Sequence, residues 1–160
     1  MLDIVFSNAV TLEFSREYPV TSEALWHALT DSKDVSAWMG YDCTFDPRPG
    51  GLFTIGVRSQ FIHAVVCYVN PGKSIVTMFR ETLIFQTVED RGSSSVHSMR
   101  QIGIVPESAA SFASGWHHLL DRLAAHLTGS LPDLTPEKIE ARYEEQFRAY
   151  AQTHGMMRPS

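Results

Sequence analysis

His97, Met99 and Gln101 are the side chains whose types and spacing most readily suggest chemistry. They occupy alternate positions in a strand-like run from Val96 to Ile104. Because successive side chains of a strand point to opposite faces, the three share one face. If that face lines a cavity, His97 and Gln101 offer hydrogen bonds and Met99 supplies an adaptable wall. The alternatives are a His97 that is satisfied by a backbone carbonyl, or the opposite register of the strand.

Large apolar side chains form a second group of candidates. Phe112, Trp116 and Leu120 recur at helical spacing late in the chain. Trp38 and Met39 precede the strand-rich region, and Phe53 lies just inside it. Such a set is typical of an ordinary core and also of an apolar ligand cavity. If Trp116 lies near a cavity mouth, its indole N–H becomes a ligand contact.

Motifs for metal or covalent chemistry are not found. His63 and Cys67 share a strand face but stand roughly 13 Å apart, too far for one metal ion. The sequence contains no Cys-x-x-Cys, His-Glu-x-x-His or Gly-x-Ser-x-Gly motif. We therefore expect no metal and no cofactor. An enzyme is the less favoured interpretation, and a cyclase-like or hydrolase-like activity would depend on His97 as acid or base.

Composition indicates one globular domain. The chain has 160 residues, 44% of them hydrophobic, and a net charge of −5, which argues against a nucleic-acid surface. Apolar stretches fall short of the roughly 20 residues that span a bilayer, and the acidic start does not resemble a signal peptide. Cys43 and Cys67 show no disulfide framework, which suits a reducing cytoplasm.

The hydrophobic pattern predicts an α+β fold that would position these residues. The segment FDPRPGG, residues 45–51, is expected to be a corner, since strand-like sequence rather than a helix follows its glycines. Two short helices precede it, the first capped by Thr21 or Ser22 and the second by Asp31 or Ser32, and long helices follow the strands. Predicted strands are Val10–Tyr18, Leu52–Arg58, Phe61–Val69, Ser74–Phe79, Thr82–Glu89 and Val96–Ile104, and predicted long helices are Ser108–Leu127 and 136–150.

Three segments resemble one protein family. LWHALTDSKDVSAWM at 25–39, FDPRPGG followed by Leu52 and Phe53, and GWHHLLDRLAAHL at 115–127 are similar to motifs of the SRPBCC superfamily (START-like, helix-grip domains). The similarity is to the branch of the activator of heat-shock-protein ATPase and covers roughly residues 10–128. It implies a curved antiparallel sheet wrapped around a long C-terminal helix, with the His97 face turned inward. The superfamily includes lipid carriers, hormone receptors and aromatic cyclases.

These expectations divide the chain into a helix-grip domain at residues 1–130 and an extension at 131–160. The extension carries an apolar stripe of Ile139, Tyr143, Phe147 and Tyr150, which packs on its own domain or contacts a second copy or a protein partner. The resemblance implies that a small hydrophobic or aromatic molecule binds between helix and sheet. A chaperone-regulating or other protein-interaction module is the alternative.

Overall fold

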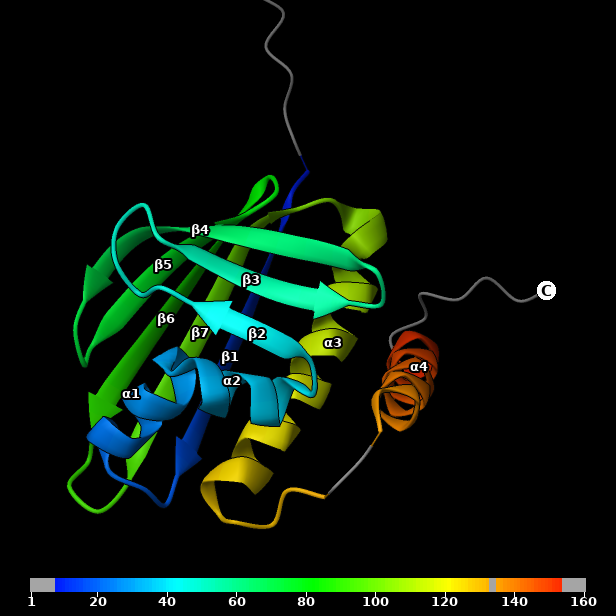
Figure 1. Cartoon of the computed structure of the whole chain (residues 1–160). Helices are drawn as coiled ribbons and strands as arrows, with labels where there is room; N and C mark the ends of the chain where they lie inside the picture. Colours follow the sequence, from blue (N-terminus) through cyan, green and yellow to red (C-terminus); the bar gives the residue numbers. More distant parts are fainter. Residues whose placement is uncertain (1–7, 133–134, 154–160) are drawn as a thin grey trace, which may run out of the picture.

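The computed structural model describes residues 8–132 and 135–153 (Figure 1). Its elements follow in the order β1 (Val10–Tyr18), α1 (Ser22–Thr30), α2 (Ser32–Met39), β2 (Asp42–Phe45), β3 (Leu52–Val57), β4 (Gln60–Asn70), β5 (Ser74–Phe79), β6 (Thr82–Asp90), β7 (Ser95–Ile104), α3 (Pro106–Leu127) and α4 (Pro136–Thr153).

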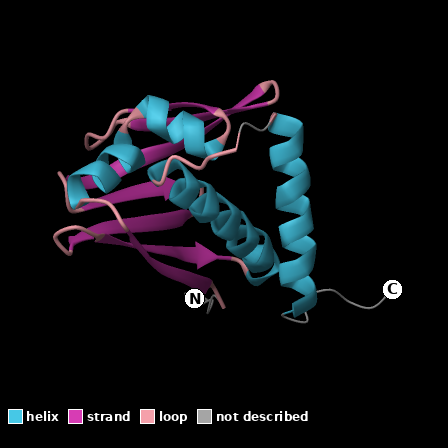
Figure 2. Ribbon diagram, turned by 90° about the horizontal axis from the view of Figure 1, so that it is seen from below, coloured by secondary structure: helices cyan, strands magenta, loops and turns pink. Residues whose placement is uncertain are grey.

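Within this part of the chain the strands form one antiparallel sheet in the order β1-β7-β6-β5-β4-β3-β2. The chain starts at one edge, crosses by α1 and α2 to the other edge, and returns strand by strand until β7 pairs with β1. The sheet curves around α3, and α1 and α2 close one end (Figures 1 and 2). This arrangement confirms the predicted α+β helix-grip fold.

The short edge strand β2 is the element that the sequence pattern does not predict. Two serines of α2 hold it in place. Ser32 Oγ accepts the backbone N–H of Phe45 at 2.9 Å, and Ser36 Oγ accepts the backbone N–H of Cys43 at 2.9 Å. Contacts with a neighbouring helix therefore define this strand, and four residues are too few to show a periodicity of their own.

The FDPRPGG segment is a corner, as predicted. Asp46 and Arg48 form an ion pair across it at 2.8 Å, and Gly50 adopts a φ of 80°. A Cβ atom on Gly51 would lie 2.2 Å from the carbonyl oxygen of Asp46, so only glycine fits there. The backbone of both glycines also bonds to Val66 of β4, which fixes the start of β3 against the sheet.

The end of α2 is held by a residue of α3. Arg122 Nε donates to the carbonyl oxygen of Trp38 at 2.6 Å, and its Nη2 donates to that of Ala37 at 3.0 Å. A cation is favourable at a helix C-terminus, because the last carbonyl groups lack helical partners. Arg122 thereby fixes the position of α2, the helix that carries Trp38 and Met39.

Helix α4 packs beside α3, on the side away from the sheet (Figure 2). The side chains of Ile139, Tyr143, Phe147 and Tyr150, on which the predicted apolar stripe depends, lie outside the described residues. In the described part of the chain, no helix combines the length and the apolar character needed to cross a membrane.

Candidate functional site

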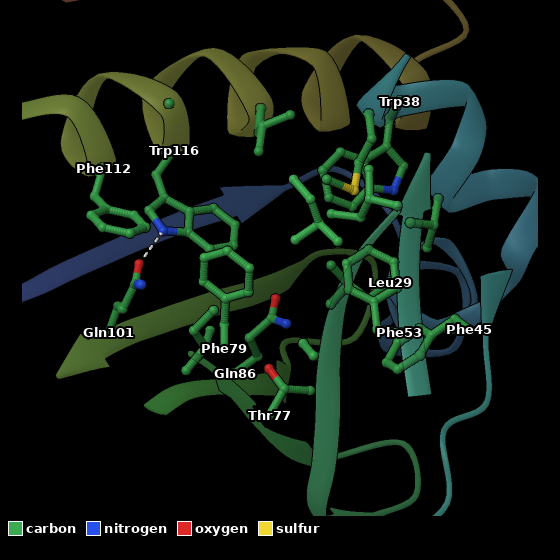
Figure 3. Close-up of a pocket in the computed structure, with 18 of the residues that line it drawn as sticks. Leu29, Trp38, Phe45, Phe53, Thr77, Phe79, Gln86, Gln101, Phe112 and Trp116 are labelled. Carbon is green, nitrogen blue, oxygen red and sulfur yellow. Dashed lines mark hydrogen bonds between the residues drawn. The ribbon is translucent and has the colours of Figure 1, made fainter. Parts of the chain in front are cut away.

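A cavity of ≈ 250 Å³ lies between α3 and the inner face of the sheet (Figure 3). It is smaller than the roughly 300–1,000 Å³ usual for drug-sized ligands. Its walls are mainly apolar and come from helices and strands far apart in sequence. The lining residues are Leu29, Val35, Trp38, Met39, Phe45, Phe53, Ile55, Ile62, Ala64, Thr77, Phe79, Ile84, Gln86, Gln101, Ser111, Phe112, Gly115, Trp116 and Leu119.

Six of the side chains singled out in the sequence meet at this cavity. They are Trp38, Met39, Phe53, Gln101, Phe112 and Trp116. Helices α2 and α3 bring two each, and β3 and β7 bring one each. The arrangement requires that the His97, Met99 and Gln101 face of β7 turns inward. All three side chains are buried, whereas Arg100, between Met99 and Gln101, is exposed.

His97, Met99 and Leu120 do not line the cavity, contrary to the sequence-based expectation. Leu120 is 2% exposed and packs in the core beside Leu123, because one helical step turns it away from the cavity and places Leu119 there instead. Met99 is buried and pairs with Phe14 of β1 and Gln86 of β6. His97 is hydrogen-bonded to Gln86, which does line the cavity.

Thr77 and Gln86 are polar lining residues that the sequence analysis missed. Thr77 is inward on β5, and Gln86 is inward on β6, opposite Ile75. The available signal was strand alternation, since Thr77 follows buried Ile75 by two and Gln86 follows buried Ile84 by two. Both side chains point toward the cavity in Figure 3.

The indole N–H of Trp116 has a partner inside the protein. It donates to Gln101 Oε1 at 2.7 Å (dashed in Figure 3), and Gln101 Nε2 donates to Thr82 Oγ1 at 2.9 Å. The hydroxyl of Thr82 in turn donates to the carbonyl oxygen of Phe79 at 2.8 Å. This chain ties α3 to β7 and β6, and it occupies the indole N–H that the sequence had suggested for a ligand.

His97 is held as a neutral imidazole. Burial lowers the pKa of His97 to about 4, and the charge of Arg16 adds to this effect. Its Nε2 atom lies 3.0 Å from Gln86 Oε1. An amide oxygen only accepts, so Nε2 carries the proton and donates it.

A cluster of His27, Asp31 and Asp34 brings its ligand-type atoms within 4.8 Å of one another at the junction of α1 and α2. Each member has a structural partner. Asp31 Oδ1 caps α2 by accepting the backbone N–H groups of Lys33 and Asp34, and His27 Nδ1 lies 2.7 Å from Asp34 Oδ2. His126 of α3 approaches the other oxygen of Asp34 at 3.4 Å. The cluster therefore connects three helices.

Comparison with protein families identifies the branch of this fold. The family model described as Activator of Hsp90 ATPase homolog 1-like protein matches residues 19–128. The chain belongs to this family. The match confirms the resemblance drawn from the three sequence motifs, and it ends where α3 ends. A search of curated proteins gives no significant match.

Solved structures share the fold at low sequence identity. A protein of unknown function from Enterococcus faecalis, EF2215, is 12% identical with a TM-score of 0.74, over 97% of this chain and 90% of that one. CalU16 from Micromonospora echinospora is 17% identical with a TM-score of 0.66, over 91% and 87%. DynU16, from the dynemicin biosynthetic locus, is 18% identical with a TM-score of 0.67, over 76% of this chain and 48% of its own.

Proposed function

We propose that the protein binds a small apolar or aromatic molecule in the cavity between α3 and the sheet. The observation that carries this proposal is the cavity itself, a space of ≈ 250 Å³ walled by Trp38, Phe53, Phe79, Phe112 and Trp116. Close packing is the rule inside proteins, so a space of this size is unusual without a role. One structural neighbour, DynU16, comes from a biosynthetic locus, which fits such a function, but it shares only the fold with this chain.

The geometry favours binding over catalysis by His97. The imidazole is 2% exposed and neutral, and it is bonded to Gln86, which lines the cavity while His97 does not. A general acid or base must come within hydrogen-bond reach of its substrate, directly or through one water molecule. His97 does not line the cavity, so an acid–base role does not form part of this proposal.

Filling the cavity tests the proposal. Ala64 is 5% exposed and lines the cavity from β4, so Ala64→Phe should place a ring in the space without breaking a hydrogen bond. Val65, its neighbour on the same strand, faces the other side of the sheet, and Val65→Phe is the matched control. We expect native protein to bind 2-acetylnaphthalene in isothermal titration calorimetry, Val65→Phe to bind it equally, and Ala64→Phe to bind it at least tenfold more weakly.

Two results would contradict this function. One is unchanged affinity in Ala64→Phe, which would place the ligand outside the cavity. The other is the absence of any small molecule in native mass spectrometry of freshly purified protein together with no binding of the aromatic probe.

The family description favours a second function, regulation of a chaperone ATPase through the protein surface. Stoichiometric capture of a chaperone from lysate by both native protein and Ala64→Phe would support it. A cytoplasmic location suits either function, and Cys43 and Cys67 are both free thiols. Contact with a second copy or a protein partner through α4 is a further proposal, tested by the mass of the protein in solution with and without residues 131–160.

A further inference from the structure

Two polar groups face the cavity without a partner inside the protein. Among the described residues, no hydrogen bond involves the hydroxyl of Thr77 or the Nε2 amide group of Gln86. Buried polar groups are normally paired, because an unpaired one costs about 1–3 kcal/mol. Both atoms remain accessible from the cavity. The hydroxyl of Ser114 on α3, by contrast, is fully buried and has no partner in the described part of the protein. Both groups are therefore available to a molecule that enters the cavity.

A hydrogen bond from His97 fixes the orientation of the Gln86 amide. His97 Nε2 donates to Gln86 Oε1 at 3.0 Å, which holds the carbonyl end of the amide on the side of His97. The Nε2 group of Gln86 is then left to donate toward the cavity. His97 lies on the neighbouring strand β7, two residues from Met99, which is the direct partner of Gln86 in the sheet. Because His97 is neutral, it holds this orientation without placing a charge beside the cavity.

The remaining polar lining groups of the sheet cannot take the same role. Both ends of the Gln101 amide are occupied, by Trp116 and Thr82. A ligand thus meets aromatic rings over most of its surface and a donor on one side, where β5 and β6 supply Thr77 and Gln86 (Figure 3).

We propose that Gln86, oriented by His97, and Thr77 form the polar contact of this cavity, which selects an aromatic ligand that carries a hydrogen-bond acceptor such as a ketone oxygen. The inference rests on the proposed function, since it names the ligand class of the same cavity. Gln86 and Thr77 contact the ligand, and His97 is a positioning residue that acts through Gln86.

A pair of ligands of nearly equal shape tests this inference. 2-Acetylnaphthalene carries a ketone oxygen, and 2-isopropenylnaphthalene replaces that oxygen with a carbon. The measured quantity is the ratio of their two affinities, by calorimetry, in native protein and variants. Gln86→Met keeps the length of the side chain and removes the donor, and we expect the ratio of ketone to alkene affinity to fall about tenfold. Thr77→Val should lower it less, and Thr87→Val, on the exposed face of β6, should not change it.

The His97 variants separate orientation from folding. His97→Leu removes the donor to Gln86 Oε1, so the amide can turn its oxygen toward the cavity and the ratio should fall. His97→Gln can still donate and should retain the native ratio. A general loss of stability would lower both affinities together and leave their ratio unchanged.

Each outcome has a distinct meaning. If both ligands bind and the ratio is the same in native protein, Gln86→Met and Thr77→Val, the polar contact is wrong while the binding function stands. If neither ligand binds native protein, both proposals fail. If Gln86→Met does not fold, Thr77→Val decides, and an unchanged ratio in that variant overturns the inference.

Discussion

The indole N–H of Trp116 on α3 donates to the side-chain oxygen of Gln101 on β7 at 2.7 Å. Gln101 is fully buried, so this bond satisfies an acceptor that water does not reach. The same contact fixes the ring that forms one wall of the cavity. Trp116 is thus a lining residue through its ring face, while its polar atom belongs to the internal framework.

Trp116→Phe should keep an aromatic wall and lose the hydrogen bond. The oxygen of Gln101 is then buried without a partner, and we expect the free energy of unfolding to fall by about 1–3 kcal/mol. Urea unfolding followed by circular dichroism measures this. Trp26→Phe is the control, because the Trp26 indole makes no hydrogen bond within the described structure. Equal losses in the two variants would show that ring size, and not the bond, is responsible.

Arg122→Met should destabilise the protein and weaken ligand binding together. It removes two charge-assisted hydrogen bonds to the last turn of α2, from a residue that is 7% exposed, and we expect a loss of about 3 kcal/mol. Calorimetry with the naphthalene probes should show reduced affinity, since α2 carries Trp38 and Met39 into the cavity wall. Arg100→Met, on the exposed face of β7, serves as the control and should lie within about 0.5 kcal/mol of native protein.

Gly51→Ala should be among the most destabilising single methyl additions in the chain. The new Cβ atom would meet the carbonyl oxygens of Asp46 and Arg48 at 2.2 and 2.9 Å, and backbone atoms cannot give way as a side-chain end can. We expect a loss of more than about 2 kcal/mol in thermal or urea unfolding. Gly72→Ala has a positive φ but open space around it, so its loss should be only about 1 kcal/mol. Similar losses at both positions would refute the steric explanation.

His97 should make the protein less stable in acid. Its folded pKa of about 4 lies below the usual value of 6.5, so its neutral form stabilises the fold fully above pH 6.5, and this contribution is lost as the pH falls toward 4. A difference of that size corresponds to about 3 kcal/mol. His97→Gln is neutral throughout and should show a shallower loss of stability between pH 7.5 and 4.5. Parallel pH profiles for the two proteins would contradict the prediction.

His27 should have the opposite dependence. Its hydrogen bond with Asp34 raises the pKa of His27, so the folded state favours the charged imidazole. The resulting stabilisation is present below pH 6.5 and disappears as the pH rises through the raised pKa. Asp34→Asn should bring the pKa of His27, followed by NMR titration, back toward 6.5. An unchanged titration in that variant would show that the Asp34 contact does not influence His27 in solution.

Much of the fold could be predicted from local pattern, because each long element buries one face and must show its period in the sequence. The strands Val10–Tyr18 and Ser74–Phe79 were predicted to the residue, and α3 differed only at its start. The three family motifs added the topology, and the family match confirms that assignment. Strand β2 was not predicted, because hydrogen bonds from its backbone to the serines of α2, rather than a pattern in its own residues, define it.

The sequence by itself determined which side chains of β7 share a face and which residue types recur on one side of α3, since alternation and helical spacing are local properties of the chain. The family resemblance, and not the alternation, indicated that the His97 face turns inward. Tertiary structure alone decided which of those side chains reach open space. Leu119 lines the cavity where Leu120 was expected, Gln86 lines it while His97 does not, and Gln101 accepts the hydrogen bond of the Trp116 indole. The positions of Leu119 and Trp116 depend on how α3 packs on the sheet, and that of His97 depends on the pairing of β6 with β7. Both are set by contacts between residues far apart in the chain.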